Sequence, residues 1–123
     1  MACFIVPATG AVISHVCAKC CTKKDSESHA QNHIAFSTKL GWLTKLLGGG
    51  AFLLAFEHIW HGEVVPWFPF LTATANPTDT AEMLHEMATS GTAMLLLCLA
   101  VWGVMLAVVH YHETKAITVE EKP

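Results

Sequence analysis

Arginine is absent from this sequence of 123 residues, and charged side chains of every kind are scarce. Only 14% of the residues are charged, compared with about 25% in soluble domains. Without the planar guanidinium of arginine, binding of nucleic acid or phosphate groups is not expected. Apolar side chains make up 53% of the chain instead. Length and composition together predict one membrane domain.

A secreted disulfide framework is also lacking, because the five cysteines are odd in number and Cys98 lies in an apolar run. Three of the others, Cys17, Cys20 and Cys21, follow His15 closely. Cys-x-x-Cys spacing is typical of metal or redox sites, but a zinc site usually needs a second pair of ligands. That pair could come only from His29, His33, His110 and His112. The alternative is interfacial thiols or sites of lipid attachment.

Three apolar stretches alternate with polar ones, which predicts an all-α integral membrane protein. Its core is an antiparallel hairpin of two strong transmembrane helices, preceded by a shorter N-terminal membrane or interfacial helix. The predicted parts are a first hydrophobic segment at 1–18, a cytoplasmic loop at 19–39, a second helix at 40–65, an extracytoplasmic loop at 66–76, a third helix at 77–112 and a disordered cytoplasmic tail at 113–123.

Local signals support these boundaries. Pro7 and Gly10 weaken the first segment as a helix, so it only barely crosses a bilayer. Trp42 and Trp67 lie near the two ends of the second segment, where membrane helices carry aromatic belts. The third helix should begin at Asn76-Pro77, an N-cap residue followed by proline.

The seven lysines predict the orientation. All lie between the first and second segments or after the third, and none lies in the 66–76 connection. By the positive-inside rule, the lysine-bearing side and the C-terminus are cytoplasmic, and the plasma (inner) membrane is the expected location.

Small residues at helical spacing predict close helix packing. One stripe is Ala51, Ala55, His58 and Gly62, and another is Ala93, Ala100, Gly103 and Ala107. Two short spans bury little surface alone, so a homo-oligomer or a larger membrane complex is expected. Cys3 and Cys98 are assigned to packing.

Ionisable side chains interrupt the second apolar stretch. A charge at the centre of a membrane helix costs roughly 2.5–3.5 kcal/mol, so these groups need partners. In an antiparallel pair of helices, Glu57 and His85 each lie about 12 Å from the connecting loop, at about 1.5 Å per residue. The predicted outer cluster is Glu57, His58, His61, Glu82 and His85, with Glu86 as a further candidate.

Imidazole and carboxylate ligands suit a transition metal such as iron or zinc. Glu82 and His85 form a Glu-x-x-His pair, and a homodimer would supply two such pairs with two copies of Glu57, as in di-iron carboxylate bundles. A haem would need only axial histidines from facing helices, His58 or His61 with His85.

Three functions follow. The first is a metal- or haem-binding redox or accessory subunit, and the second is a non-catalytic scaffold or assembly subunit in which the cluster ties helices together. The third is a proton or ion path. No nucleophile with its base is evident, so the sequence leaves open whether the protein is an enzyme.

Overall fold

The structure is a computed structural model that describes residues 2–25, 34–68 and 70–122. In these ranges the fold is all-α, as the sequence predicted, with one isolated β-bridge between Val64 and Leu71. The predicted 19–39 loop falls largely on residues 26–33, which lie outside the described residues.

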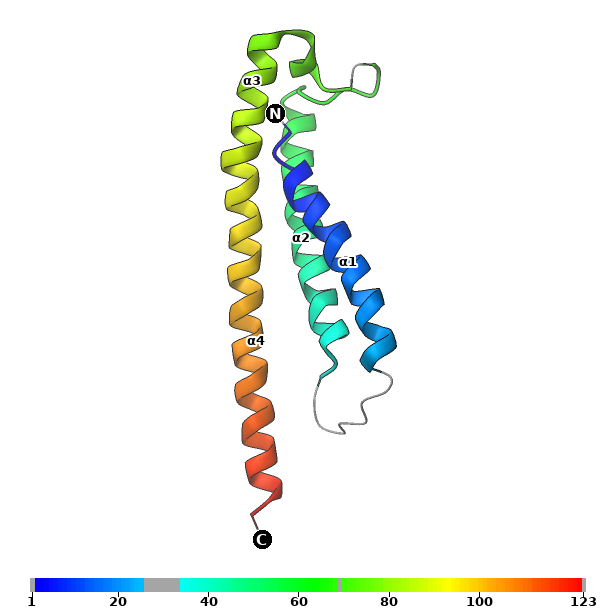
Figure 1. Ribbon diagram of the computed structural model, residues 1–123. Helices are drawn as coiled ribbons and strands as arrows, with labels where there is room; N and C mark the ends of the chain where they lie inside the picture. Colours follow the sequence, from blue (N-terminus) through cyan, green and yellow to red (C-terminus); the bar gives the residue numbers. More distant parts are fainter. Residues whose placement is uncertain (1, 26–33, 69, 123) are drawn as a thin grey trace.

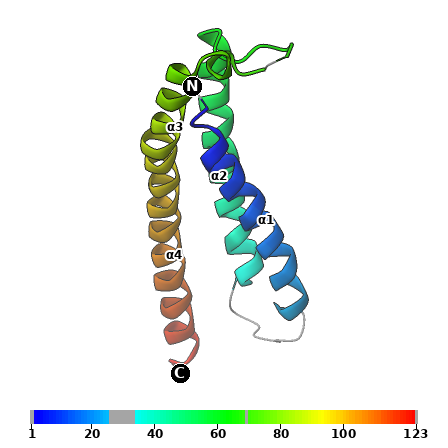
Figure 2. The same ribbon diagram turned by 45° about the horizontal axis from the view of Figure 1, so that its top comes forward.

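Three long helical segments lie side by side (Figures 1 and 2). Helix α1 spans Ile5–Asp25 and α2 spans Phe36–Trp60. After a connection that contains the short 3-10 helix Thr72–Ala75, the chain forms α3 (Pro77–Glu86), a π-helical turn (Met87–Gly91) and α4 (Thr92–Glu120). The last three make one continuous rod of 44 residues, about 66 Å long at about 1.5 Å per residue.

The rod begins at Pro77, as expected, but Asn76 does not cap it with its side chain. The Asn76 side chain donates instead to Asp79, with Nδ2 and Oδ2 separated by 3.2 Å. Thr80 donates its hydroxyl to the backbone carbonyls of Asn76 and Ala73, which joins the start of α3 to the preceding turn.

Helix α2 ends at Trp60, five residues before the predicted end. Gly62 has a φ of 73°, the left-handed conformation that ends helices most readily at glycine. The Glu63 N–H donates to the His58 carbonyl at 2.9 Å, and the Gly62 N–H donates to the Ile59 carbonyl at 3.0 Å. These two bonds form a Schellman motif, which turns Glu63 back toward the last turn of α2.

The C-terminal tail differs from the prediction, because α4 continues through residues 113–120. Thr114 and Thr118 each donate a side-chain hydrogen bond to the carbonyl four residues earlier. Glu113 anchors this turn to the start of α2 through Lys39 at 3.6 Å and the Ile34 N–H at 2.8 Å. Helix α1 likewise runs seven residues past its predicted end, with Lys23 and Lys24 in its last turn, where cations are favourable.

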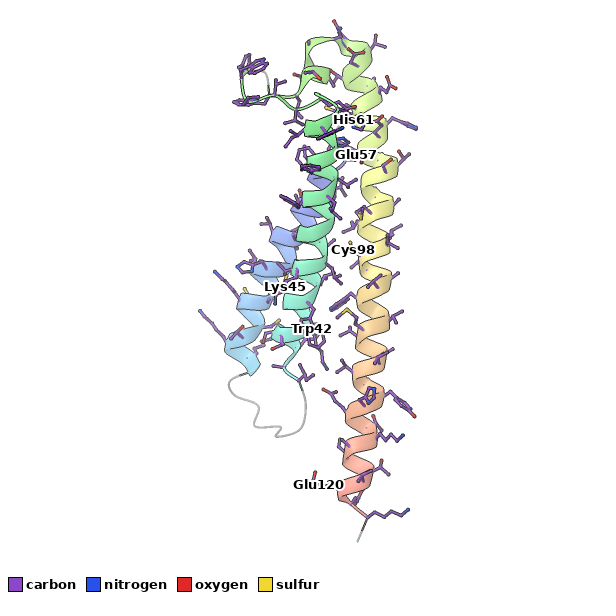
Figure 3. The ribbon with its side chains drawn as sticks, turned by 180° about the vertical axis from the view of Figure 1, so that it is seen from behind. Trp42, Lys45, Glu57, His61, Cys98 and Glu120 are labelled. Carbon is purple, nitrogen blue, oxygen red and sulfur yellow. The ribbon has the colours of Figure 1, made fainter. Side chains whose placement is uncertain are left out.

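The core lies between α1, α2 and α4 and is made by Leu40, Leu43, Leu47 and Cys98. Helix α4 presents Cys98 toward α2 (Figure 3). Gly50 makes this approach close, because a Cβ there would lie 3.2 Å from the Met94 sulfur. The predicted α4 stripe of Ala93, Ala100, Gly103 and Ala107 is exposed in the single chain, so its packing against another helix stays a prediction. Larger side chains at spacing four, Met94, Cys98 and Trp102, fill the interface instead.

Within the described residues, two helices are long and apolar enough to cross a membrane, Ile5–Lys24 and Pro77–Glu120. Helix α2, predicted as a strong span, is not among them, since Lys45, Glu57 and three consecutive glycines lower its hydropathy. The N-terminal helix is therefore a stronger candidate span than the sequence suggested.

The two ends of the bundle differ. We call the end where α2 meets the 61–76 connection and α3 the pocket end. The opposite end, where α1 stops, α2 starts and α4 stops, is the lysine end, since Lys24, Lys39 and Lys115 lie near those helix limits (Figure 1).

Candidate functional site

A cavity of about 340 Å³ opens at the pocket end. We call it the outer pocket. Its polar lining includes Cys3, Glu57, His58, His61, Glu63 and Glu86. Glu57 and His61 lie near the end of α2 that adjoins the rod (Figure 3). Three of the five predicted site residues, Glu57, His58 and His61, thus line one cavity.

His58 is the centre of this site, and its side chain is buried. Its Nε2 lies 2.7 Å from the Cys3 sulfur, and its Nδ1 lies 3.2 Å from Oε2 of Glu63. A neutral imidazole that carries its proton on Nδ1 satisfies both contacts, because it faces the carboxylate with N–H and accepts from the thiol at Nε2. The Phe4 ring lies 5.9 Å away, centroid to centroid, and covers the imidazole.

Burial raises the pKa of the Cys3 thiol above its ordinary value. The resting thiol is therefore protonated at neutral pH. The thiol proton is the one that the His58 Nε2 lone pair can accept, which gives the Cys3–His58 contact a defined donor and acceptor.

The N-terminal segment is held in place by a close fit to the rod. A Cβ at Gly91 would lie 2.8 Å from the Cys3 carbonyl oxygen and 2.8 Å from Cγ2 of Val6, so only glycine allows this approach. Ala2 is fully buried beside Ala73 and Met83. The π-helical turn that ends at Gly91 thus packs directly against the backbone of Cys3.

Glu57 and His61 share a face of α2 but are exposed. The His61 ring bonds to the backbone of its own helix, with Nδ1 2.9 Å from the Glu57 carbonyl oxygen, so Nδ1 is the donor there. This bond leaves Nε2 of His61 as the ring nitrogen able to accept or ligate.

Glu82 and His85 do not line the outer pocket, and both are exposed on α3. The face of the rod toward α2 and the N-terminal segment carries Met83, Glu86 and Ser90. These positions are three and four residues apart, which is one helical face. Side chains of α3 reach the pocket at about the predicted level along the helix, but from a different face of it. Glu86 therefore lines the pocket where His85 was expected.

No group of three or more His, Cys, Asp or Glu side chains in the described ranges is arranged to hold a metal ion. Both ring nitrogens of His58 already have neighbours within one chain. The predicted binding of iron, zinc or haem by Glu57, His58, His61, Glu82 and His85 therefore stays a proposal.

The second predicted cluster lies at the lysine end. Cys17 and Cys20 are exposed free thiols, and Cys21 is partly buried against the core. His29 and His33 lie outside the described residues, so completion of a site by them is not described.

Sequence reasoning missed Cys3 and Glu63 as members of the site. Cys3 is 55 residues from His58, and no local spacing connects the two. The sequence did contain a signal for Glu63. A glycine directly after an apolar helix, here Gly62, predicts a reversal of the chain that returns the next side chain toward the last turn of that helix.

Comparison of the chain with protein-family models, with curated protein sequences and with solved structures gave no match.

Proposed function

We propose that this chain is a small integral membrane protein that acts as a non-catalytic scaffold or assembly subunit in a homo-oligomer or larger membrane complex. Helix α1 spans the membrane with the α3–α4 rod, and α2 lies between the same two ends of the bundle, antiparallel to the rod as the second arm of a transmembrane hairpin. The lysine end, with the C-terminus, faces the cytoplasm across the plasma (inner) membrane.

The orientation is supported by the distribution of charge over the bundle. Lysines gather where α1 ends, α2 begins and α4 ends, and the 61–76 connection has none. These three helix limits lie at the same end of the bundle (Figure 1). A bundle with all its lysines toward one end satisfies the positive-inside rule in only one orientation.

A scaffold role is supported above all by the contacts of His58. One buried imidazole touches Cys3 from the N-terminal segment and Glu63 from the 61–76 connection, while itself belonging to α2. The ring thereby joins three segments of the chain. A cluster whose central group is occupied in this way is a structural tie, as intramembrane ionisable residues commonly are.

An assembly role is supported by the outer surface of α4. Large apolar side chains remain exposed there, among them Leu96, Leu97, Val101, Val104 and Val108. The small-residue stripe of α4 is exposed as well, which leaves it free to pack against a second helix. Lipid covers some of this surface, and a copy or partner covers the stripe.

Metal analysis and an optical spectrum of protein purified in detergent, without chelator and from metal-replete cells, test the scaffold proposal. The expected result is a colourless, metal-free protein that runs as an oligomer. His58→Ala should loosen the pocket end, while His110→Ala at the exposed lysine end serves as the matched control. Stoichiometric metal or a haem spectrum in the wild type would overturn the proposal.

A second candidate is a metal- or haem-binding accessory subunit whose site forms between two copies. Exposure of Glu57, Glu82 and His85 favours it, because exposed ligands are available to a neighbouring chain. In that case His85→Ala should remove bound metal and His110→Ala should not. Equal metal content in both variants would exclude a site built on α3.

A further inference from the structure

We propose that Cys3 is an acyl-acceptor site, at which its thiol takes a long-chain fatty acyl group from an acyl thioester with His58 as the base. The proposal concerns a covalent modification of this chain and goes beyond the scaffold role. It stands whether or not the protein assembles with a partner.

The first support is the order of three groups around one imidazole. Cys3 Sγ lies 2.7 Å from His58 Nε2, and Glu63 Oε2 lies 3.2 Å from Nδ1 on the other side of the ring. A thiol, a base and a group that orients the base are the arrangement by which proteins activate a nucleophile. Cys3 is buried, with 4% of its surface exposed, but it lines the outer pocket, which is the side from which a reagent would approach.

The second support is an apolar groove of about 370 Å³ in the part of the bundle that follows the N-terminal segment. It runs between α1 and the rod and is lined by Ile5, Val6, Ile13, Met87 and Leu95, with Thr9 and Gly10. Ile5, the first lining residue of the groove, is two residues from Cys3 along the chain, so a long acyl chain on that sulfur is long enough to reach it. The polar outer pocket, which Cys3 itself lines, suits the thioester head.

Gly10 lines this groove and is closely packed. A Cβ at Gly10 would lie 3.1 Å from Cδ1 of Leu95 and 3.3 Å from Cδ1 of Leu47, so a side chain there would enter the packing around the groove. A fatty chain is the occupant that matches both the apolar lining and the covalent attachment point.

The reaction is a thioester exchange that balances without an oxidant or reductant. The Cys3 sulfur attacks the thioester carbonyl while His58 Nε2 accepts the thiol proton. The new bond joins Cys3 Sγ to the acyl carbon, and the bond from that carbon to the departing sulfur breaks. The proton on His58 then passes to the departing thiolate, and Glu63 faces the Nδ1–H of the transient imidazolium.

Other cysteines offer a comparison within the same chain. The Cys98 thiol is buried too, but it donates to the Leu46 carbonyl, with sulfur and oxygen 3.7 Å apart. Cys17 and Cys20 are exposed at the lysine end. Preference for Cys3 over the exposed thiols is therefore a signature of His58 assistance, since exposure alone favours the other two.

The test uses the full chain purified in detergent and incubated with palmitoyl-coenzyme A. Mass spectrometry should show one hydroxylamine-sensitive palmitoyl group, located on the peptide that contains Cys3. Cys3→Ser should abolish it, and Cys17→Ser should leave it unchanged. His58→Asn should slow transfer roughly a hundredfold or more, the usual contribution of a general base.

Acyl chain length provides a readout in the wild type itself, and acetyl transfer serves as the folding control for a variant in the groove. In the wild type, palmitoyl-coenzyme A should react faster than acetyl-coenzyme A, and Gly10→Phe should remove that difference while acetyl transfer continues. Label that appears first on Cys17 or Cys20, no label at all, or an unchanged rate in His58→Asn would each overturn the proposal.

Discussion

Different kinds of interaction stabilise the pocket end and the lysine end of the bundle. At the pocket end, a buried imidazole and a glycine-dependent close contact fix the N-terminal segment. At the lysine end, the Trp102 indole donates to the Lys39 carbonyl at 2.7 Å, and Lys39 pairs with Glu113 at 3.6 Å. Substitutions at the first end should therefore have steeper effects than substitutions at the second.

This difference in sensitivity to substitution follows from the kinds of polar side chain that each end contains. Burying a polar group costs free energy unless the group is hydrogen-bonded. Few substitutions should therefore be tolerated at the buried positions of the pocket end. The Lys39–Glu113 pair is largely shielded, with side chains 17% and 9% exposed, but its 3.6 Å separation is long for a charge-assisted hydrogen bond, so the lysine end depends on summed weak contacts. The close fit at the pocket end holds Cys3 in a fixed contact with His58, and a charged end is suited to a membrane surface.

The largest effect is expected for Gly91→Ala. The added methyl group meets the Cys3 carbonyl oxygen and Val6, and backbone cannot move away as a flexible side chain can. Overpacking of this kind destabilises by about 1–3 kcal/mol. Thermal unfolding in detergent should show the loss, together with release of Cys3 to thiol reagents.

Gly49→Ala on α2 is the matched control for that variant, since a Cβ there meets nothing within 4 Å. Alanine favours the helix by up to about 1 kcal/mol over glycine, so this variant should be neutral or slightly stabilised. Equal destabilisation by the two substitutions would contradict the close fit at Gly91.

A smaller loss is expected for Trp102→Phe at the lysine end. The ring keeps most of its packing, but the N–H that the Lys39 carbonyl accepts is removed. The expected loss is about 0.5–1.5 kcal/mol, the net contribution of one hydrogen bond. A larger loss of unfolding free energy in Trp102→Phe than in Gly91→Ala would contradict the expectation that the pocket end is more sensitive to substitution than the lysine end.

The smallest effect is expected for Glu113→Gln. The amide keeps an acceptor for the Ile34 N–H and removes the charge that faces Lys39. The 3.6 Å separation is long for a charge-assisted hydrogen bond, so the expected loss is about 1 kcal/mol or less. Because the two side chains are only 17% and 9% exposed, salt screens the pair weakly, and the difference in unfolding between wild type and variant should persist at high salt.

Much of the fold was accessible from sequence, because apolar runs and helix starts are local signals. The proline at position 77 correctly placed the beginning of the rod. Helix ends were less accessible, since Gly62 stops α2 early and Glu113 extends α4 through partners far along the chain. The α2–α4 contact within one chain was not evident from the small-residue stripe, because Gly50 on α2 admits the larger Met94.

The site was only partly accessible for a related reason. Glu57, His58 and His61 share one helix, and their meeting follows from helical spacing. The contribution of Cys3 depends on docking of a separate helix, and that of Glu86 in place of His85 depends on the face of α3 turned to the pocket. Neither is determined by the local sequence, because each is set by packing between segments.

The orientation of the two ends across a membrane is the central claim, and accessibility of single cysteines tests it most directly. Thr74→Cys at the pocket end and Thr118→Cys at the lysine end, each in a chain without its five native cysteines, give matched sites, since both threonines are exposed and donate only to nearby carbonyls. In intact cells, a membrane-impermeant maleimide should label the first variant and reach the second only after permeabilisation. Labelling of Thr118→Cys in intact cells, or recovery of the protein in the soluble fraction, would contradict the account.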